Sequence, residues 1–126
     1  MSNLPLRLAL IVFGVIFVLV YPLVIVWPSG WAWHMGAPYG SQYFMMIVGV
    51  YVTLGVFLIL AARNPDANRS LIWFTIISSL VHGAIMGVQA LQMPEHRGHL
   101  MGDVPGLMVV AIVLAFLMTF RKKDLT

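Results

Sequence analysis

Three long stretches of the sequence contain no Lys, Arg, Asp or Glu: residues 8–62, 70–94 and 104–120. A helix needs about 20 consecutive apolar residues to cross a hydrocarbon core of about 30 Å. The first stretch therefore accommodates two crossings, and the other two accommodate one each. The composition agrees, because 61% of the residues are hydrophobic and only 9% are charged, whereas soluble domains average about 25% charged residues. The sequence predicts a membrane protein.

Turn-forming residues divide these stretches into helices. We predict a single membrane domain over residues 1–126, an all-α bundle with up-down topology and helices at about 5–27, 42–62, 70–92 and 99–120, because short loops make consecutive helices antiparallel neighbours. Pro22 should kink the first helix near its outer end. Asn68 or Ser70 is expected to cap the third helix. The run before Trp27 is too long for a signal peptide and has no clean cleavage site.

The distribution of basic residues predicts the orientation. Positive residues in short loops resist translocation, so they mark the cytoplasmic side. Only Arg97 falls on one side, and six fall on the other: Arg7, Arg63, Arg69, Arg121, Lys122 and Lys123. Both termini are therefore expected in the cytoplasm. The loops around His34 and His96 then face outward, with an outer aromatic belt of Trp27, Trp31, Trp33, Tyr39 and Tyr43.

Several classes of chemistry have no support in the sequence. The absence of cysteine removes disulfides, thiolate ligands and thiol catalysis. The seven basic residues are scattered beside apolar runs, so no basic face indicates a nucleic-acid partner. We find no phosphate-binding loop, nucleophile elbow or zincin motif. Methionines in the outer half are interpreted as packing residues, although methionine sulfur also binds copper(I).

His82 is the most informative single residue, because ionisable side chains inside a membrane span are costly and usually face the bundle interior or a watery cavity. Ser78 and Gln89 lie four positions before and seven positions after it, on about the same helix face. His82 and Gln89 are therefore candidate cofactor-binding residues. The alternative is a structural role, in which a neutral His82 donates one hydrogen bond that holds the bundle together.

A second constellation comprises His96, His99 and Asp103. If the fourth helix begins by about residue 96, then His99 and Asp103, at positions i and i+4, point the same way, as metal-binding pairs on helices do. Adjacent helices would bring them near His82. Nitrogen and carboxylate ligands together suit a transition metal. Paired histidines on facing helices could also hold haem. Alternatively, Asp103 caps the fourth helix and the histidines are solvated in the loop.

The third predicted helix also carries a packing signal. Ser79, Gly83 and Gly87 recur every four residues, a pattern of small side chains that lets a partner helix approach closely in lipid. Such a pattern is common in membrane helices. It predicts a packing face and does not indicate a function.

Five motifs resemble those of a known family: Ala61-Ala62-Arg63-Asn64-Pro65, Arg69-Ser70-Leu71-Ile72-Trp73-Phe74, His82-Gly83-Ala84-Ile85-Met86, Gln89-Ala90-Leu91 and Gly98-His99-Leu100-Met101-Gly102-Asp103-Val104-Pro105. Over about residues 40–118 the chain is similar to small bacterial four-helix membrane proteins that form a domain of unknown function. The resemblance implies a multi-pass protein of the bacterial inner membrane. It places His82, His99 and Asp103 inside family-like motifs and implies no activity.

These observations leave three hypotheses for function. The first is a non-enzymatic, accessory bundle that associates with itself or with a larger membrane complex and binds a metal, haem or small ligand at an outer polar site. The second is a minimal redox enzyme unit, linked to haem or quinone, that uses the same histidines. The third is a small oligomeric transporter. Transporters commonly contain helices broken near the midplane, whereas Pro22 and Pro105 are expected near helix ends, which counts against the third hypothesis.

Overall fold

The computed structural model describes residues 4–27, 42–94 and 102–120, with only the backbone of Asp103. Every regular element in these ranges is helical. The elements in chain order are α1 (Leu4–Val18), α2 (Val20–Val26), α3 (Gln42–Ala61), the short 3₁₀ helix η3 (Pro65–Asn68), α4 (Arg69–Gln92) and α5 (Asp103–Phe120). The prediction of an all-helical chain is therefore confirmed for the part that the structure describes.

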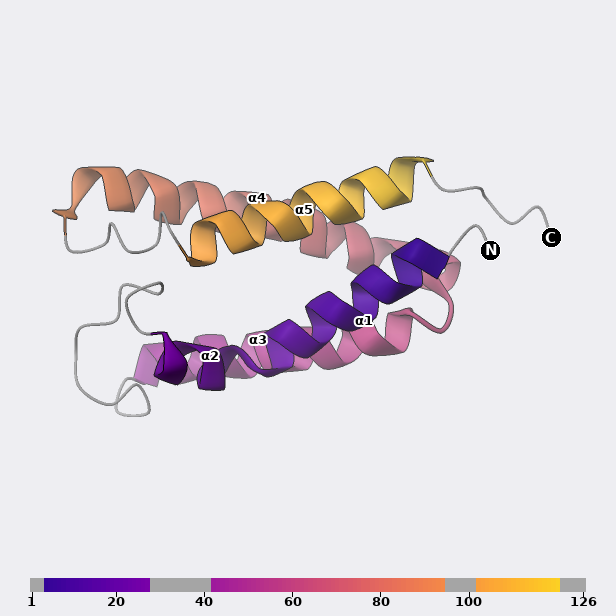
Figure 1. Cartoon of the computed structure of the whole chain (residues 1–126), viewed down its shortest axis with the longest axis horizontal. Helices are drawn as coiled ribbons and strands as arrows, with labels where there is room; N and C mark the ends of the chain where they lie inside the picture. The colour runs from indigo at the N-terminus through magenta and orange to yellow at the C-terminus, as the bar shows by residue number, and fades with distance from the viewer. Residues whose placement is uncertain (1–3, 28–41, 95–101, 121–126) are drawn as a thin grey trace.

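The helices form two antiparallel pairs (Figure 1). In the first hairpin, α1 packs along α3, and in the second, α4 packs along α5. The pairs contact each other chiefly through α1 and α5 and diverge toward the end where α2 lies (Figure 1). We call this the far end and the opposite end, where α1 begins and α5 ends, the basic end.

Glycine allows the first hairpin to pack closely. A Cβ atom built on Gly55 would lie 2.5 Å from the carbonyl oxygen of Gly14, and one built on Gly14 would lie 2.7 Å from the carbonyl oxygen of Gly55. The two backbones are therefore in direct contact, which any larger side chain would prevent. This close approach increases van der Waals contact, the main attraction between helices in lipid.

The predicted packing face of α4 lies against α5. Ser79 and Gly83 are buried. A Cβ on Gly83 would lie 2.5 Å from Met108 Cε, and one on Gly87 would lie 4.0 Å from Val104 Cγ1. The small side chains of α4 thus accommodate larger ones from α5.

The first predicted helix is two helices rather than one kinked helix. α1 and α2 meet at Leu19 with a bend of 62°. Pro22 has no N–H to donate to the carbonyl of Val18, and its ring crowds that carbonyl. At the break itself, the backbone N–H of Leu19 donates to the carbonyls of both Val15 and Ile16, at 3.0 and 3.1 Å. The helix therefore breaks about one turn before the proline.

The turn between the hairpins is capped differently from the prediction. Asn64 Oδ1 accepts a hydrogen bond from Ala67 N at 3.3 Å, which caps η3. Asn68 occupies the cap position of α4, but its side chain donates to the carbonyl of Asn64 at 2.9 Å and does not cap that helix. Ser70 lies inside α4. Asparagine therefore stabilises the tight connection itself.

Two helical segments, Gln42–Ala61 and Pro65–Gln92, are long and apolar enough to cross a membrane, and the bent α1–α2 pair is a third candidate if counted as one span. Val104–Phe120 is apolar but shorter. Large hydrophobic side chains are exposed on the outer faces of the helices, such as Val50 at 66% and Phe74 at 61%. A helix whose outward face is also apolar is better suited to a lipid environment than to water.

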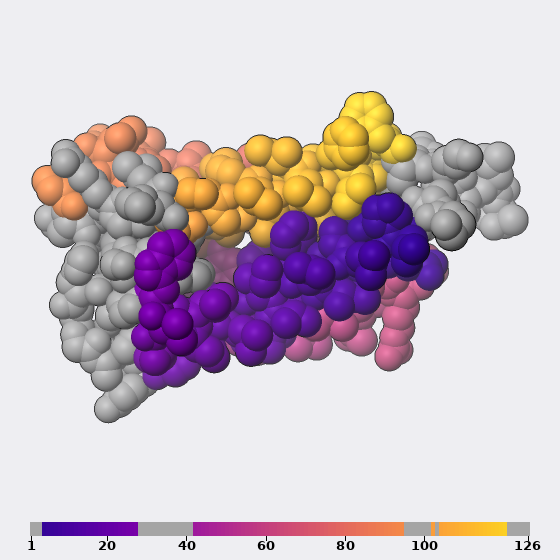
Figure 2. All heavy atoms as spheres, viewed as in Figure 1, coloured from indigo at the N-terminus to yellow at the C-terminus, as the bar shows by residue number. Residues whose placement is uncertain are grey.

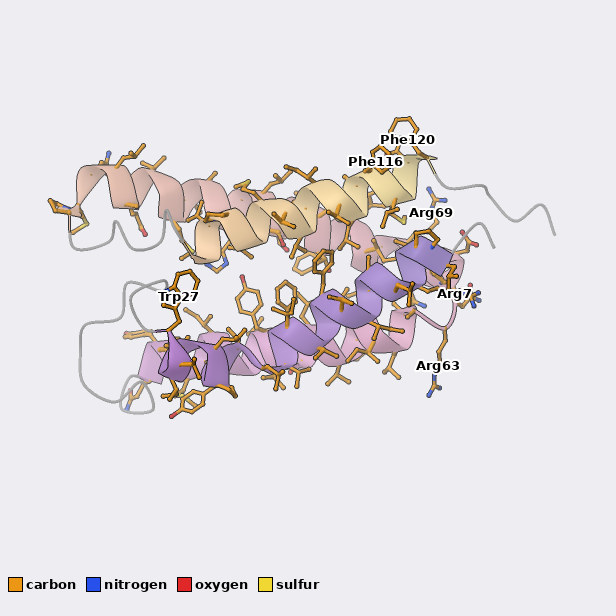
Figure 3. The ribbon with its side chains drawn as sticks, viewed as in Figure 1. Arg7, Trp27, Arg63, Arg69, Phe116 and Phe120 are labelled. Atoms are coloured by element: carbon orange, nitrogen blue, oxygen red, sulfur yellow. The ribbon has the colours of Figure 1, made fainter. Side chains whose placement is uncertain are left out.

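The described arginines and the described members of the predicted aromatic belt lie at opposite ends of the bundle. Arg7, Arg63 and Arg69 lie at the basic end, whereas Trp27 lies at the far end (Figure 3). Trp27 and Tyr43 are both exposed there. The other members of the basic cluster and of the aromatic belt lie outside the described residues.

Candidate functional site

A hydrogen bond between the two hairpins contains the predicted histidine. His82 lies near the middle of α4 and is half-buried. Its Nδ1 atom is 2.5 Å from the hydroxyl oxygen of Tyr51, which lies at the middle of α3 and is also half-buried. This is a polar contact between two helices whose neighbouring side chains are mostly apolar. It joins the first hairpin to the second.

The Tyr51 ring also contacts α1. Its centroid lies 5.2 Å from that of Phe17, with an interplanar angle of 63°, an edge-to-face arrangement. The Tyr51 and His82 rings are 5.7 Å apart and tilted by 38°. Aromatic pairs at such separations contribute about 0.5–1.5 kcal/mol beyond their buried area. Phe17 is buried, so α1, α3 and α4 together fix the position of the tyrosine hydroxyl.

The direction of this hydrogen bond depends on the histidine tautomer. If the imidazole proton is on Nε2, the Tyr51 hydroxyl donates to Nδ1. If the proton is on Nδ1, that group donates to the hydroxyl oxygen of Tyr51. In both cases one hydrogen bond joins α3 to α4.

The three residues of the predicted polar stripe, Ser78, His82 and Gln89, do not act together in one contact between helices. Ser78 Oγ donates to the carbonyl of Thr75 at 3.3 Å, and buried Thr75 donates to the carbonyl of Leu71 at 2.9 Å. Both hydroxyls are therefore satisfied within α4. Gln89 is exposed, two turns beyond His82. Of the three, the structure gives only His82 a partner on another helix.

The second predicted constellation lies mostly outside the described residues. This applies to His96, His99 and the side chain of Asp103, so their proposed meeting with His82 stays a prediction. α5 begins at Asp103, and Gly102 before it lies in a turn whose carbonyl accepts the first helical hydrogen bond, from Gly106 N at 3.1 Å. The fourth helix was expected from about residue 99, and its start at His99 lies outside the described residues.

The described ranges contain no group of three His, Asp or Glu side chains that could hold a metal ion. A metal site built from the predicted residues would need His96, His99 or the carboxylate of Asp103, which lie beyond those ranges. The prediction of a metal or haem therefore stays open. What the described residues provide is the hydrogen-bonded Tyr51–His82 pair.

Sequence reasoning missed Tyr51. It lies in an uncharged span and was not singled out as a polar group. A signal was present, because Tyr51 and Thr53 are the only polar side chains between Phe44 and Ala62. A hydroxyl in the middle of a span prefers an interhelical partner, and His82 was the nearest candidate by depth.

Comparison with known proteins identifies the family but no characterised relative. No curated protein and no solved structure matches the chain. Residues 3–124 match a family of unknown function, DUF6632. The match covers nearly the whole chain, including every helix described above. The chain therefore belongs to the family of unknown function DUF6632.

Proposed function

We propose that this chain is a four-span protein of the bacterial inner membrane that acts as an accessory, ligand-binding bundle, with His82 and Tyr51 as its polar site. The observation that carries the proposal is the Tyr51–His82 hydrogen bond, formed at mid-height between two apolar helices. Ionisable groups at such a depth are expensive and usually functional. A few polar side chains in an apolar setting are typical of a small-molecule site.

Four spans require α1 with α2 to form one bent crossing and α5 to form the last. α5 has 18 residues, so it is about 27 Å long, close to the hydrocarbon thickness of about 30 Å. Its antiparallel packing on α4 at Gly83 supports this assignment. The arginines at the basic end support a cytoplasmic position for that end. The partners are then the lipid bilayer and either further copies of the chain or a larger membrane complex.

The topology can be tested directly because the chain contains no cysteine. Ala67→Cys, in the turn at the basic end, and Gln92→Cys, at the far end, are both at exposed positions. With an impermeant maleimide on intact cells, we expect Gln92→Cys to be labelled and Ala67→Cys to be labelled only after lysis. Labelling of both residues from one side would overturn the four-span topology.

Ligand binding is tested on the full chain purified in mild detergent. Visible spectra, elemental metal content and mass spectrometry of an organic extract are compared for the wild type and His82→Ala. Ser78→Ala is the control, because its hydroxyl bonds only within α4. We expect a bound metal, haem or organic molecule in the wild type and in Ser78→Ala, and its loss in His82→Ala. An empty wild type with intact helices would refute the ligand-binding function.

The helix break favours transport as a second candidate. The 62° bend at Leu19 lies about two-thirds of the way along the α1–α2 pair, close to Phe17 and hence to Tyr51. Broken helices beside a polar site at membrane depth are characteristic of secondary transporters. Four helices enclose little space, so transport would require an oligomer. Chemical crosslinking in native membranes tests the transport candidate, which fails if the chain is monomeric.

A further inference from the structure

Three segments of the chain each place an arginine at the basic end (Figure 3). Arg7 is the fourth residue of α1, Arg63 follows the end of α3, and Arg69 is the first residue of α4. All three side chains are exposed, and none forms an ion pair or a side-chain hydrogen bond with the residues that the structure describes. Asp66 is the one acidic side chain within the described ranges. The described part of the basic end therefore carries an excess of positive charge.

Two of these arginines are at positions where a helix disfavours a cation. The macrodipole of a helix gives its N-terminus a partial positive charge, so a cation there is destabilising and an anion is stabilising. Arg69 begins α4 and Arg7 lies in the first turn of α1, and neither helix has an acidic residue in its first turn. An anion bound at the basic end would therefore interact favourably with the guanidinium groups and with both helix termini.

Exposed aromatic rings lie at the same end of the bundle. Phe116 and Phe120, in the last two turns of α5, are 59% and 72% exposed, and their ring centroids are 4.9 Å apart. Because α5 is antiparallel to α4, both rings lie toward the end where Arg69 begins α4 (Figure 3). Figure 2 shows the last turn of α5, in yellow, standing out from the surface of the bundle. The basic end thus presents an apolar surface as well as cations.

We infer that the basic end binds a phospholipid whose headgroup carries a net negative charge. The headgroup lies at the guanidinium groups of Arg7, Arg63 and Arg69, since arginine binds phosphate oxygens through paired hydrogen bonds. An acyl chain lies on the rings of Phe116 and Phe120. Charge complementarity selects this occupant, because a phospholipid presents its anion at the depth where the helices leave the hydrocarbon core. The inference rests on the four-span topology of the proposed function and is independent of the Tyr51–His82 site.

Tryptophan fluorescence can report lipid binding at each end of the bundle separately. Trp73 lies one turn after Arg69 on α4, whereas Trp27 lies at the far end (Figure 3). Two full-length chains each keep one of these tryptophans, and the other three tryptophans of each chain are replaced by phenylalanine. Both are reconstituted into phosphatidylcholine vesicles that contain a rising fraction of brominated phosphatidylglycerol or brominated phosphatidylcholine. Bromine quenches only nearby tryptophan, so the two titrations give the relative affinity of the lipids at each end.

We expect brominated phosphatidylglycerol to bind beside Trp73 about tenfold or more tightly than brominated phosphatidylcholine, since each arginine contributes about fivefold. Beside Trp27 we expect the two lipids to bind equally. Inorganic phosphate, compared with chloride at equal ionic strength, should not displace the anionic lipid. Displacement by phosphate would identify a site for a free anion and refute the inference. Equal quenching by both lipids at Trp73, or the same preference at Trp27, would also refute it.

Variants of the Trp73 chain test whether the arginines are responsible. Arg69→Gln should lower the preference for phosphatidylglycerol about fivefold, whereas Arg69→Lys keeps the charge and should retain most of it. Adding Gln92→Arg, at an exposed position of the far end, restores the net charge of Arg69→Gln without restoring the preference at Trp73. If Arg69→Gln does not fold, Arg63→Gln, in the exposed turn, should give the same fivefold loss. A preference unchanged by both glutamine variants would overturn the inference.

The outcomes also separate this inference from the proposed function. If the lipids bind equally at Trp73 while the maleimide labelling agrees with four spans, this inference alone fails. If the labelling overturns the four spans, the proposed function and this inference fail together.

Discussion

The backbones of Gly14 and Gly55 are in contact across the first hairpin, with each carbonyl oxygen where the other residue would carry a Cβ atom. The two residues are 41 positions apart in sequence, and their contact sets how closely α1 approaches α3.

Gly55→Ala should destabilise the protein by about 1–3 kcal/mol, because the new methyl group meets rigid backbone at 2.5 Å and the helices must separate. Gly49→Ala is the matched control on the same helix, with nothing within 4 Å of the added atom. It should stabilise the protein by up to about 1 kcal/mol through helix propensity. Unfolding by dodecyl sulfate in mixed micelles, followed by circular dichroism, measures both. Equal effects of the two variants would argue against the close contact.

Gly83→Ala should cost less than Gly55→Ala, although the added atom is also 2.5 Å from its neighbour. That neighbour is the terminal methyl group of Met108, which can rotate away, since methionine has three flexible bonds. The same unfolding assay applies. In a Met108→Ala background, adding Gly83→Ala should cost little further stability. A large further loss, measured against Met108→Ala alone, would indicate that the α5 backbone, rather than Met108, is crowded.

The Tyr51–His82 hydrogen bond predicts thermodynamic coupling between the hairpins. In a double-mutant cycle with Tyr51→Phe and His82→Leu, we expect a coupling energy of about 0.6–1.7 kcal/mol, the range for interhelical hydrogen bonds in membranes. Tyr51→Phe combined with Ser78→Ala should be additive, because Ser78 bonds within its own helix. Unfolding free energies of the single and double variants give both values. A coupling energy near zero for the Tyr51–His82 pair would contradict the contact.

Pro22→Ala should straighten the first span, because it restores an N–H donor for the Val18 carbonyl. Spin labels at Leu8→Cys and Val26→Cys report the angle, and both positions are exposed. The helix axis positions are about 23 Å apart with the 62° bend and about 27 Å apart in a straight helix. Pulsed electron paramagnetic resonance should therefore show an increase of up to about 4 Å. Pro5→Ala, in the first turn, should leave the distance unchanged, and an unchanged distance in Pro22→Ala would assign the bend to packing against α3.

Local signals in the sequence predicted much of the secondary structure. The expected starts of the second and third helices, residues 42 and 70, agree with Gln42 and Arg69 to within one residue. Charge and proline mark these boundaries, and both act over a few residues. The packing face at Ser79 and Gly83 was also predicted, because its repeat of small residues lies within one helix.

The contacts between helices were harder to predict. Gly14 is an isolated glycine in α1, so no repeat marks it as a packing position, and its partner depends on how α1 rotates against α3. The same applies to His82, whose partner was sought on the fourth helix near Asp103, whereas the structure shows a hydrogen bond with Tyr51 on α3. Hydropathy fixes the depth of a side chain in the membrane but not the direction in which it points around the helix axis. The strength of the Pro22 effect was underestimated for a related reason, because a proline can break a helix about one turn before its own position.

Among the described residues, the buried cluster to which both hairpins contribute includes Leu58 and Ala61 at the basic end of α3 and Ile72 and Ile76 at that end of α4. This arrangement has a consequence for biosynthesis. Each hairpin has its own pairing surface, at Gly14 and Gly55 in one and at Gly83 and Met108 in the other, and only the turn around Pro65 connects them covalently. In the proposed four-span topology, the first hairpin can therefore insert and pair before the second leaves the ribosome. If that topology holds, two polypeptides divided within that turn and translated separately should associate in the bilayer and restore the fold.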